Sequence, residues 1–156
     1  MDRRAVFCAV IVAGSSLLWM PASAQAPGSV AIKTADAPQA IGPYSQGVSA
    51  GPFVYLAGQI GLDPASGQLV AGGTDVEARR AMANLGAVLK AAGLTFADVV
   101  KTTIYLTDIA DFAKVNAEYA AFFPPGATLP ARATVGIASL ARGAHVEIEA
   151  VAFRSR

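Results

Sequence analysis

Cysteine and histidine are almost absent from this chain, and their scarcity limits the chemistry that it can carry out. The 156 residues include one cysteine, Cys8, and one histidine, His145. Cys8 lies in an apolar N-terminal segment, and without that segment the chain has no disulfide, no thiolate nucleophile and no thiolate metal ligand. A single histidine cannot build a histidine-rich metal site.

Several motifs that announce an enzyme class are also missing. The sequence contains no phosphate-binding glycine loop, no dinucleotide fingerprint, no zinc-binding helix motif and no serine in a nucleophile elbow. No internal repeat or low-complexity tract is visible. Any catalysis therefore has to use arginine, glutamate, backbone groups and water.

The first 24 residues have the pattern of a secretory signal peptide. A basic start, MDRR, precedes the apolar run AVFCAVIVAGSSLLWM, and PASAQA supplies small residues for cleavage, which we place after Ala24. The alternative is a membrane anchor, but Gly14, Ser15 and Ser16 interrupt a run that is shorter than the ~20 residues needed to span a bilayer. We therefore expect a periplasmic or secreted protein, without membrane association after cleavage, whose residues 25–156 form a single domain.

The remaining chain carries no net charge. The 12 lysines and arginines include two within residues 1–24, and the 11 acidic residues include one, so ten of each remain. Nucleic-acid-binding proteins usually present a basic patch or stripe. We therefore expect no nucleic acid partner.

Hydrophobic periodicity predicts strands alternating with helices. A Gly- and Pro-rich loop separates the first strand from a hairpin, which turns at residues 50–52. The expected strands cover residues 30–33, 53–57, 101–106, 132–138 and 145–153, with one more before the hairpin turn, and the helices cover residues 73–94 and 111–123. This order is typical of an α+β sandwich in which the helices cover one face of a sheet. The other face carries Val and Phe, which favours self-association.

The first helix has the clearest pattern. Thr74 and Glu77 are spaced as a capping box, in which each side chain satisfies a backbone donor of the first turn. Gly93 is expected to end the helix, with Leu94 as the apolar contact beyond it. One apolar stripe contains Ala78, Ala81, Met82, Leu85, Leu89 and Ala92.

Two glutamates in the last predicted strand raise a question of chemistry. In HVEIEAVAF, Glu147 and Glu149 share a face with Phe153, and a buried carboxylate on such a face needs a partner. Arg132, in LPARATVGIA, is the upstream candidate. It is either a clamp for a small carboxylate ligand or a structural ion pair with one of the glutamates. Glu147 is either a general base that orients water or a solvated carboxylate.

Three further residues have both a functional and a structural interpretation, and a fourth has a structural one only. Tyr44 follows a stiff Ile-Gly-Pro turn and is either the wall of a ligand pocket or a core residue. Asn116 binds either a ligand or nearby backbone. Gly58 lets backbone approach a ligand closely or marks a β-bulge. His145 is expected to be a surface residue at a strand edge.

Six segments in order closely resemble the Rid family of reactive-intermediate deaminases, the YjgF-type proteins. They lie between about residues 34 and 153, and each of them alone is a weak signal, whereas all six at the family's spacing are a strong one. The segments are AIGPYSQGV, LAGQIG, NLGAVLKAAGL, VVKTTIYLTDIADFAKVNAEYAAFF, PARATV and VEIEAVA.

This resemblance implies both a fold and a reaction. The fold would be chorismate-mutase-like, of the bacillus type, with two helices on one face of a β-sheet and trimers formed through the sheets. The homotrimer would hold its pockets at subunit interfaces. The reaction would be that of a 2-iminobutanoate/2-iminopropanoate deaminase, which hydrolyses imino or enamino acids such as 2-aminoacrylate to 2-keto acids and ammonia. No metal or organic cofactor would be needed.

The resemblance also assigns roles to individual residues. Arg132 resembles the carboxylate clamp and Glu147 the residue that orients water, while Tyr44, Gly58 and Asn116 resemble substrate-binding residues. Two pocket positions depart from the family's pattern. Ala57 stands where serine is usual, which removes a hydroxyl. Thr134 stands where cysteine is frequent, although it keeps the backbone N–H that this position is thought to offer.

Two other functions are consistent with the same sequence. A non-catalytic trimer that binds small 2-keto carboxylates would use the same pocket, with Ala57 marking lost chemistry. Endoribonuclease activity is also ascribed to family members, but the neutral chain without a basic stripe argues against it.

Overall fold

The sheet has six strands, and the last strand in sequence lies at its centre. The computed structural model describes residues 28–155, so the predicted signal peptide lies outside the described residues. The strands are β1 (Val30–Ile32), β2 (Gly47–Ala50), β3 (Phe53–Ile60), β4 (Val99–Leu106), β5 (Ala131–Gly136) and β6 (Val146–Phe153), and the helices are α1 (Thr74–Ala91) and α2 (Phe112–Ala120). Short 3-10 helices span Phe96–Asp98, Ile109–Asp111 and Ala141–Gly143. No helix within residues 28–155 has the length and apolar character that crossing a membrane requires.

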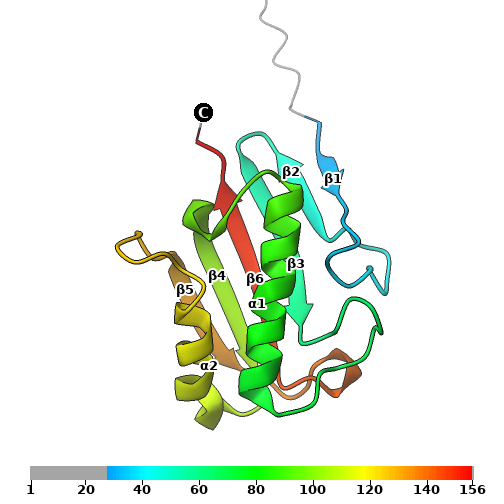
Figure 1. Ribbon diagram of the computed structural model, residues 1–156, viewed down its shortest axis with the longest axis vertical. Coiled ribbons are helices and arrows are strands. Elements are labelled where there is room, and N and C mark those ends of the chain that lie inside the picture. The colour runs from blue at the N-terminus through cyan, green and yellow to red at the C-terminus, as the bar shows by residue number, and fades with distance from the viewer. Residues whose placement is uncertain (1–27, 156) are drawn as a thin grey trace, which may run out of the picture.

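The strand order is β1-β2-β3-β6-β4-β5, with β6 inserted between β3 and β4 (Figure 1). All neighbouring strands are antiparallel except β4 and β5, which are parallel. Parallel neighbours need a crossover connection, and α2 lies within this one. The topology makes β1 and β5 the two edges of the sheet.

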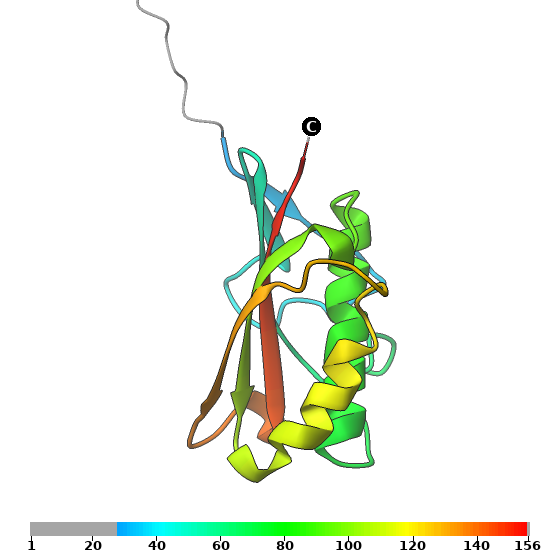
Figure 2. The same ribbon diagram turned by 90° about the vertical axis from the view of Figure 1, so that its left-hand side faces the viewer.

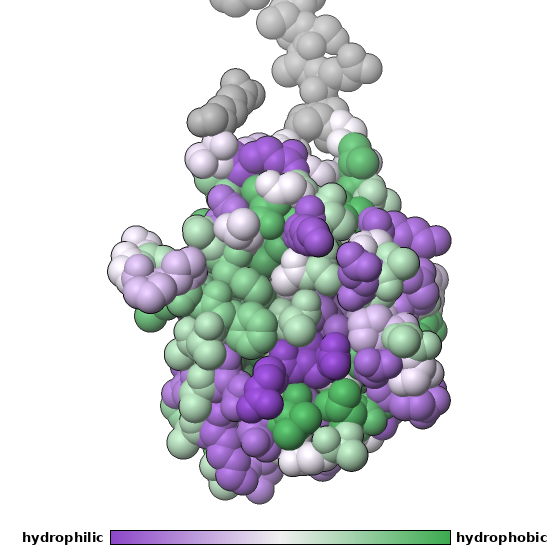
Figure 3. All heavy atoms as spheres, in the orientation of Figure 1, coloured by the Kyte–Doolittle hydropathy of each residue, from purple (hydrophilic) through white to green (hydrophobic). Residues whose placement is uncertain are grey.

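Both helices cover the same face of the sheet, as predicted (Figure 2). Their apolar sides and that sheet face enclose the core, and the surface on the helix side mixes hydrophilic with hydrophobic side chains (Figure 3). The largest fully buried apolar side chains include Met82, Leu85, Leu89, Ile104, Leu106 and Ile148. The predicted α+β class is therefore confirmed.

The two ends of α1 differ in how well the sequence predicted them. Gly93 has a φ of 72°, and the Leu94 N–H donates to the Leu89 carbonyl at 2.9 Å, which is the expected glycine-terminated end. The predicted capping box is wrong. Gly73 is the N-cap without a side-chain bond, while the Thr74 hydroxyl donates to Asp111 and the Glu77 carboxylate contacts His145. Tertiary partners have replaced the local ones.

No helix or strand of the described residues covers the other face of the sheet, which we call the open face (Figure 2). Three aromatic side chains on it, those of Phe53, Tyr55 and Phe153, are 39%, 50% and 39% exposed. The Phe53 and Phe153 rings pack edge to face with centroids 5.3 Å apart. Glu147 and Glu149 lie on this face because β6 alternates, with Ile148 and Ala150 buried on the helix side.

Most strand boundaries fall close to their predicted positions. The largest difference is in β3, which continues three residues beyond the predicted end at residue 57 and reaches Ile60. The added residues include a register shift between Leu56 and Gln59 in the pairing with β6. This irregular segment is where the candidate site begins.

Candidate active site

Glu147 lies against the irregular part of β3. It is the first residue of β6 paired with β3, opposite Ile60, and it also pairs with Tyr105 of β4. A Cβ added at Gly58 would lie 2.0 Å from Glu147 Oε1, a separation that real side chains do not reach. Gly58 therefore lies in the irregular segment, as the bulge interpretation expects, and its missing Cβ leaves room for the Glu147 carboxylate. The close approach of a ligand to this backbone stays a prediction.

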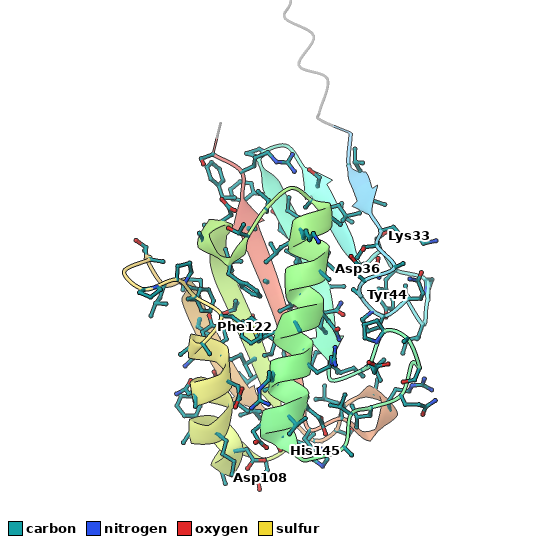
Figure 4. The ribbon with its side chains drawn as sticks, viewed as in Figure 1. Lys33, Asp36, Tyr44, Asp108, Phe122 and His145 are labelled. Atoms are coloured by element: carbon teal, nitrogen blue, oxygen red, sulfur yellow. The ribbon has the colours of Figure 1, made fainter. Side chains whose placement is uncertain are left out.

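The Glu147 carboxylate lines a cavity that is open to solvent. The cavity has a volume of about 70 Å³, and its walls include Pro38, Gln39, Ile41, Tyr44, Gly58 and Gln59. Tyr44 projects from the loop between β1 and β2 (Figure 4). Its hydroxyl accepts a hydrogen bond from the Ile41 N–H at 3.2 Å, which folds the ring over its own turn. Tyr44 is thus a cavity wall and not a core residue.

A buried glutamine shapes the loop that carries Tyr44. The Gln46 side chain is 3% exposed, and its amide nitrogen donates to the Pro38 and Thr34 carbonyls at 2.8 and 3.0 Å. Its amide oxygen accepts from the Thr34 N–H at 2.7 Å. Sequence reasoning missed Gln46 and the cavity residue Gln59 because a buried amide leaves no periodic signal.

The surroundings of Glu147 favour its protonated form. Burial raises the pKa of its carboxyl, and the nearby Glu149 carboxylate raises that pKa further. Among the described residues, no salt bridge joins Glu147 or Glu149 to a cation. The structural ion pair between Arg132 and one of these glutamates, one of the two alternatives from the sequence, is therefore absent among the described residues.

Arg132 lies on edge strand β5 and faces the other side of the sheet. It pairs with Thr102, whose hydroxyl lies 2.9 Å from the Tyr119 hydroxyl of α2. Directly paired residues point to the same face, so Arg132 faces the helix side, whereas Glu147 faces the open side. The two residues that the resemblance assigns to catalysis do not meet within one chain.

The Arg132 guanidinium is exposed and stacks on two aromatic rings of α2. Its central carbon lies 4.9 Å from the Tyr119 ring centroid and 5.6 Å from that of Phe112. Asn116 is half-buried on the same stripe of α2, between these two aromatic residues in sequence. The stacking orients the guanidinium and leaves its N–H donors without a described carboxylate.

Thr134, two residues beyond Arg132, faces the same side of the sheet. Its hydroxyl oxygen is buried and has no hydrogen-bond partner among the described residues, which is uncommon for a buried polar atom. Ala57 does not line the Glu147 cavity; its backbone N–H donates to the Gln46 carbonyl at 3.0 Å.

The predicted site residues thus form two separate groups. The glutamate half-site consists of Tyr44, Gly58 and Glu147. The arginine half-site consists of Arg132, Thr134 and Asn116. Within residues 28–155, no three acidic, histidine or cysteine side chains lie close enough together to hold a metal ion.

His145 is a surface residue, as predicted, and it makes a contact that the sequence did not indicate. It immediately precedes β6, near the N-terminal end of α1 (Figure 4). Its side chain is 55% exposed, yet its Nδ1 lies 2.6 Å from Glu77 Oε1, and Glu77 is 2% exposed. The expected surface residue is bonded to a buried acid.

Known proteins resemble the chain over almost all of the described range. The profile of the family described as Endoribonuclease L-PSP matches residues 34–154. The chain is 54% identical over 121 residues to the 2-iminobutanoate/2-iminopropanoate deaminase of Mus musculus, covering 78% of this chain and 88% of that protein.

Solved structures share the fold. The YjgF gene product of E. coli is 45% identical, with a TM-score of 0.77 over 81% of this chain and 99% of that one. E. coli TdcF, solved with bound serine, is 42% identical, with a TM-score of 0.77 and the same coverage. The sequence similarity and the fold agree with each other.

Proposed function

Because the chain belongs to the Endoribonuclease L-PSP family, also called the YjgF or Rid family, we propose that it is an imine deaminase of the 2-iminobutanoate/2-iminopropanoate type. Glu147 is the observation that carries this function. It is a cavity carboxylate with a raised pKa and no described cation partner, which suits a base that holds water. Bound serine in TdcF supports a small ligand with a carboxylate.

The active site would form between chains of a homotrimer. Arg132 and Glu147 face opposite sides of the sheet, so one chain cannot bring both to the same small substrate. The exposed aromatics of the open face supply an apolar surface that a second copy would cover.

The reaction follows from these positions. Arg132 binds the substrate carboxylate through two parallel hydrogen bonds, helped by a backbone N–H near Thr134. Glu147 of the neighbouring chain accepts a proton from water, whose oxygen attacks the C=N carbon to give a carbinolamine. Glu147 passes this proton to the imine nitrogen. It then transfers the hydroxyl proton of the carbinolamine to the amino nitrogen as the C–N bond breaks, which releases ammonia and the 2-keto acid. The imine is already electrophilic, so positioning is the main contribution and no metal or organic cofactor is required.

Export would place this activity outside the cytoplasm. The signal peptide pattern of residues 1–24 supports a periplasmic or secreted protein cut after Ala24. N-terminal sequencing of the protein recovered from the producing cell tests this, because a mature chain beginning at Gln25 is expected. A chain that keeps Met1 and stays with the membrane would contradict it.

The activity itself is tested with imines generated by an amino-acid oxidase. The rate of imine loss with and without the protein is compared for substrates with different side chains. Faster loss that depends on protein concentration supports the deaminase. Equal rates, together with tight binding of a 2-keto acid, would favour the non-catalytic carboxylate-binding trimer.

Endoribonuclease activity is the second candidate because the family's description carries that name. The balance of ten basic and ten acidic residues after position 24 gives no field that would attract RNA. We expect no RNA retention at moderate salt. Retention that survives the Arg132→Ala substitution would point to an RNA site elsewhere on the chain.

A further inference from the structure

A buried acid of α1 holds the residue that precedes β6. Glu77 Oε2 accepts a hydrogen bond from the His145 backbone N–H at 2.7 Å, and Glu77 Oε1 lies 2.6 Å from His145 Nδ1. From the other side, the Thr107 N–H donates to the His145 carbonyl at 3.0 Å. We call the contact between the first two residues the Glu77–His145 clasp.

The clasp lies where α1 begins, β3 ends and β6 begins. A Cβ added at Gly61, just after β3, would lie 2.7 Å from the Glu77 Cα, so the backbone of this segment runs directly against α1. About two turns further along α1, the Asn84 amide donates to the Leu62 carbonyl at 2.9 Å. Burying a carboxylate costs free energy unless it is paired, and the partner of the Glu77 carboxylate is the residue that precedes β6.

Glu147 lies two residues after His145 in the sequence. It is the first β6 residue paired with β3, and strand ends open first unless other contacts hold them. Its carboxylate fits against Gly58 with no spare room. The position of Glu147 in the cavity therefore depends on how firmly the start of β6 is held.

We propose that Glu77 and His145 are positioning residues for the reaction, because their clasp fixes the start of β6 and thereby keeps the Glu147 carboxylate against Gly58. This rests on the proposed function, in which Glu147 takes the proton from water. Neither residue lines the Glu147 cavity, so both act through the strand and not on the substrate.

The clasp also makes the position of Glu147 sensitive to pH. Glu77 raises the pKa of His145, and Asp111 adds to the effect. Asp111 itself accepts from Lys114 at 2.8 Å and from Thr74. A raised histidine pKa means that the imidazolium–carboxylate contact is complete below the usual value of 6.5 and weakens as the pH rises through the folded-state pKa.

Variants of Glu77 separate positioning from general stability. Glu77→Ala removes the clasp, Glu77→Gln keeps an acceptor for the His145 N–H, and Glu118→Gln is the matched control. Glu118 accepts from Arg79 at 2.7 Å, so the control loses an ion pair between the helices without touching β6. We expect Glu77→Ala to lower kcat on the order of 10- to 100-fold with little change in KM, as for a displaced catalytic group. Glu77→Gln should recover much of kcat, and the control should keep it.

Carbon-13 NMR of the Glu147 carboxyl provides a second readout that needs no activity. When β6 is released, Glu147 should become more exposed, so its pKa should fall in Glu77→Ala toward its usual 4.5. The raised pKa should persist in Glu77→Gln and in the Glu118→Gln control.

His145→Phe tests the ring contact alone, since the backbone bond to Glu77 remains. The wild-type kcat should decline as the pH rises through the His145 pKa, and the variant should lose that decline. If Glu77→Ala does not fold, this variant and Glu77→Gln carry the test.

The proposal is overturned if Glu77→Ala loses thermal stability as the control does while kcat and the Glu147 titration stay as in the wild type. An unchanged pH profile in His145→Phe would overturn it as well. If the wild type hydrolyses no imine, the proposed function fails, and the Glu147 titration still decides the clasp.

Discussion

The two half-sites differ in how much of their geometry one chain supplies. The glutamate half-site is held by a β-bulge, by the close fit of Gly58 and by the loop that Gln46 ties down. The arginine half-site lies on edge strand β5, where Arg132 is exposed and only stacks on α2. One chain thus supplies a complete cavity around Glu147, whereas the N–H donors of Arg132 have no described carboxylate partner. For this reason the proposed site needs a second copy of the chain.

Removing the clamp should have the largest effect. Arg132→Ala should lower kcat/KM by about 10³-fold, because the substrate carboxylate would lose its charged partner. Arg80→Ala is the control, because Arg80 is a half-buried arginine of α1 outside both half-sites, and it should leave kcat/KM unchanged. An equal loss of kcat/KM in both variants would mean that Arg132 has no specific role in binding the substrate carboxylate.

Removing the base should have a smaller effect than removing the clamp. Glu147→Gln should lower kcat by about 10²-fold, near the low end for a general base, because the imine is already reactive. Glu149→Gln, on the same strand and the same face, is the matched control. A loss as large in the control would mean that Glu147 is not the residue that holds water.

A smaller loss is expected from crowding the glutamate half-site. Gly58→Ala places a methyl group where Glu147 Oε1 now lies, so the carboxylate has to move, and kcat should fall by about 10-fold. Gly136→Ala is the control because its added Cβ would lie 3.8 Å from Ile109, an ordinary contact. Steady-state kinetics on the two variants show whether the close fit matters for the reaction.

The smallest effect concerns stability and pH. His145 has a raised pKa beside Glu77, so its charge stabilises the fold below pH 6.5, and this contribution is lost as the pH rises through the folded-state pKa. The melting temperature of the wild type should therefore fall relative to that of His145→Phe over this range. If the two melting temperatures differ by the same amount at every pH from 5 to 9, the charge of His145 does not contribute to stability.

Local patterns predicted the helices and the faces of β6. The apolar stripe of α1, its end at Gly93 and the alternation around Glu147 all follow from residues close together in sequence. Those signals were sufficient for the α+β class and for placing two glutamates on the open face.

Contacts between distant segments were not predictable in the same way. Glu77 has the spacing of a capping residue, but its carboxylate bonds to His145, 68 residues away. The side of the sheet that Arg132 faces depends on the pairing of β5 with β4, and no local alternation of residues encodes that pairing. The residues that the resemblance named fall into two half-sites, and only the register shows that Arg132 and Glu147 face opposite sides of the sheet.

Subunit complementation tests the central claim most directly. Arg132→Ala and Glu147→Gln proteins, each with little activity, are mixed, exchanged under mild denaturation and reassembled. If each site takes Arg132 from one chain and Glu147 from its neighbour, random mixing restores roughly a quarter of the sites, and the activity rises well above that of either parent. A mixture that stays at the activity of its parents, although subunits have exchanged, would contradict the shared site.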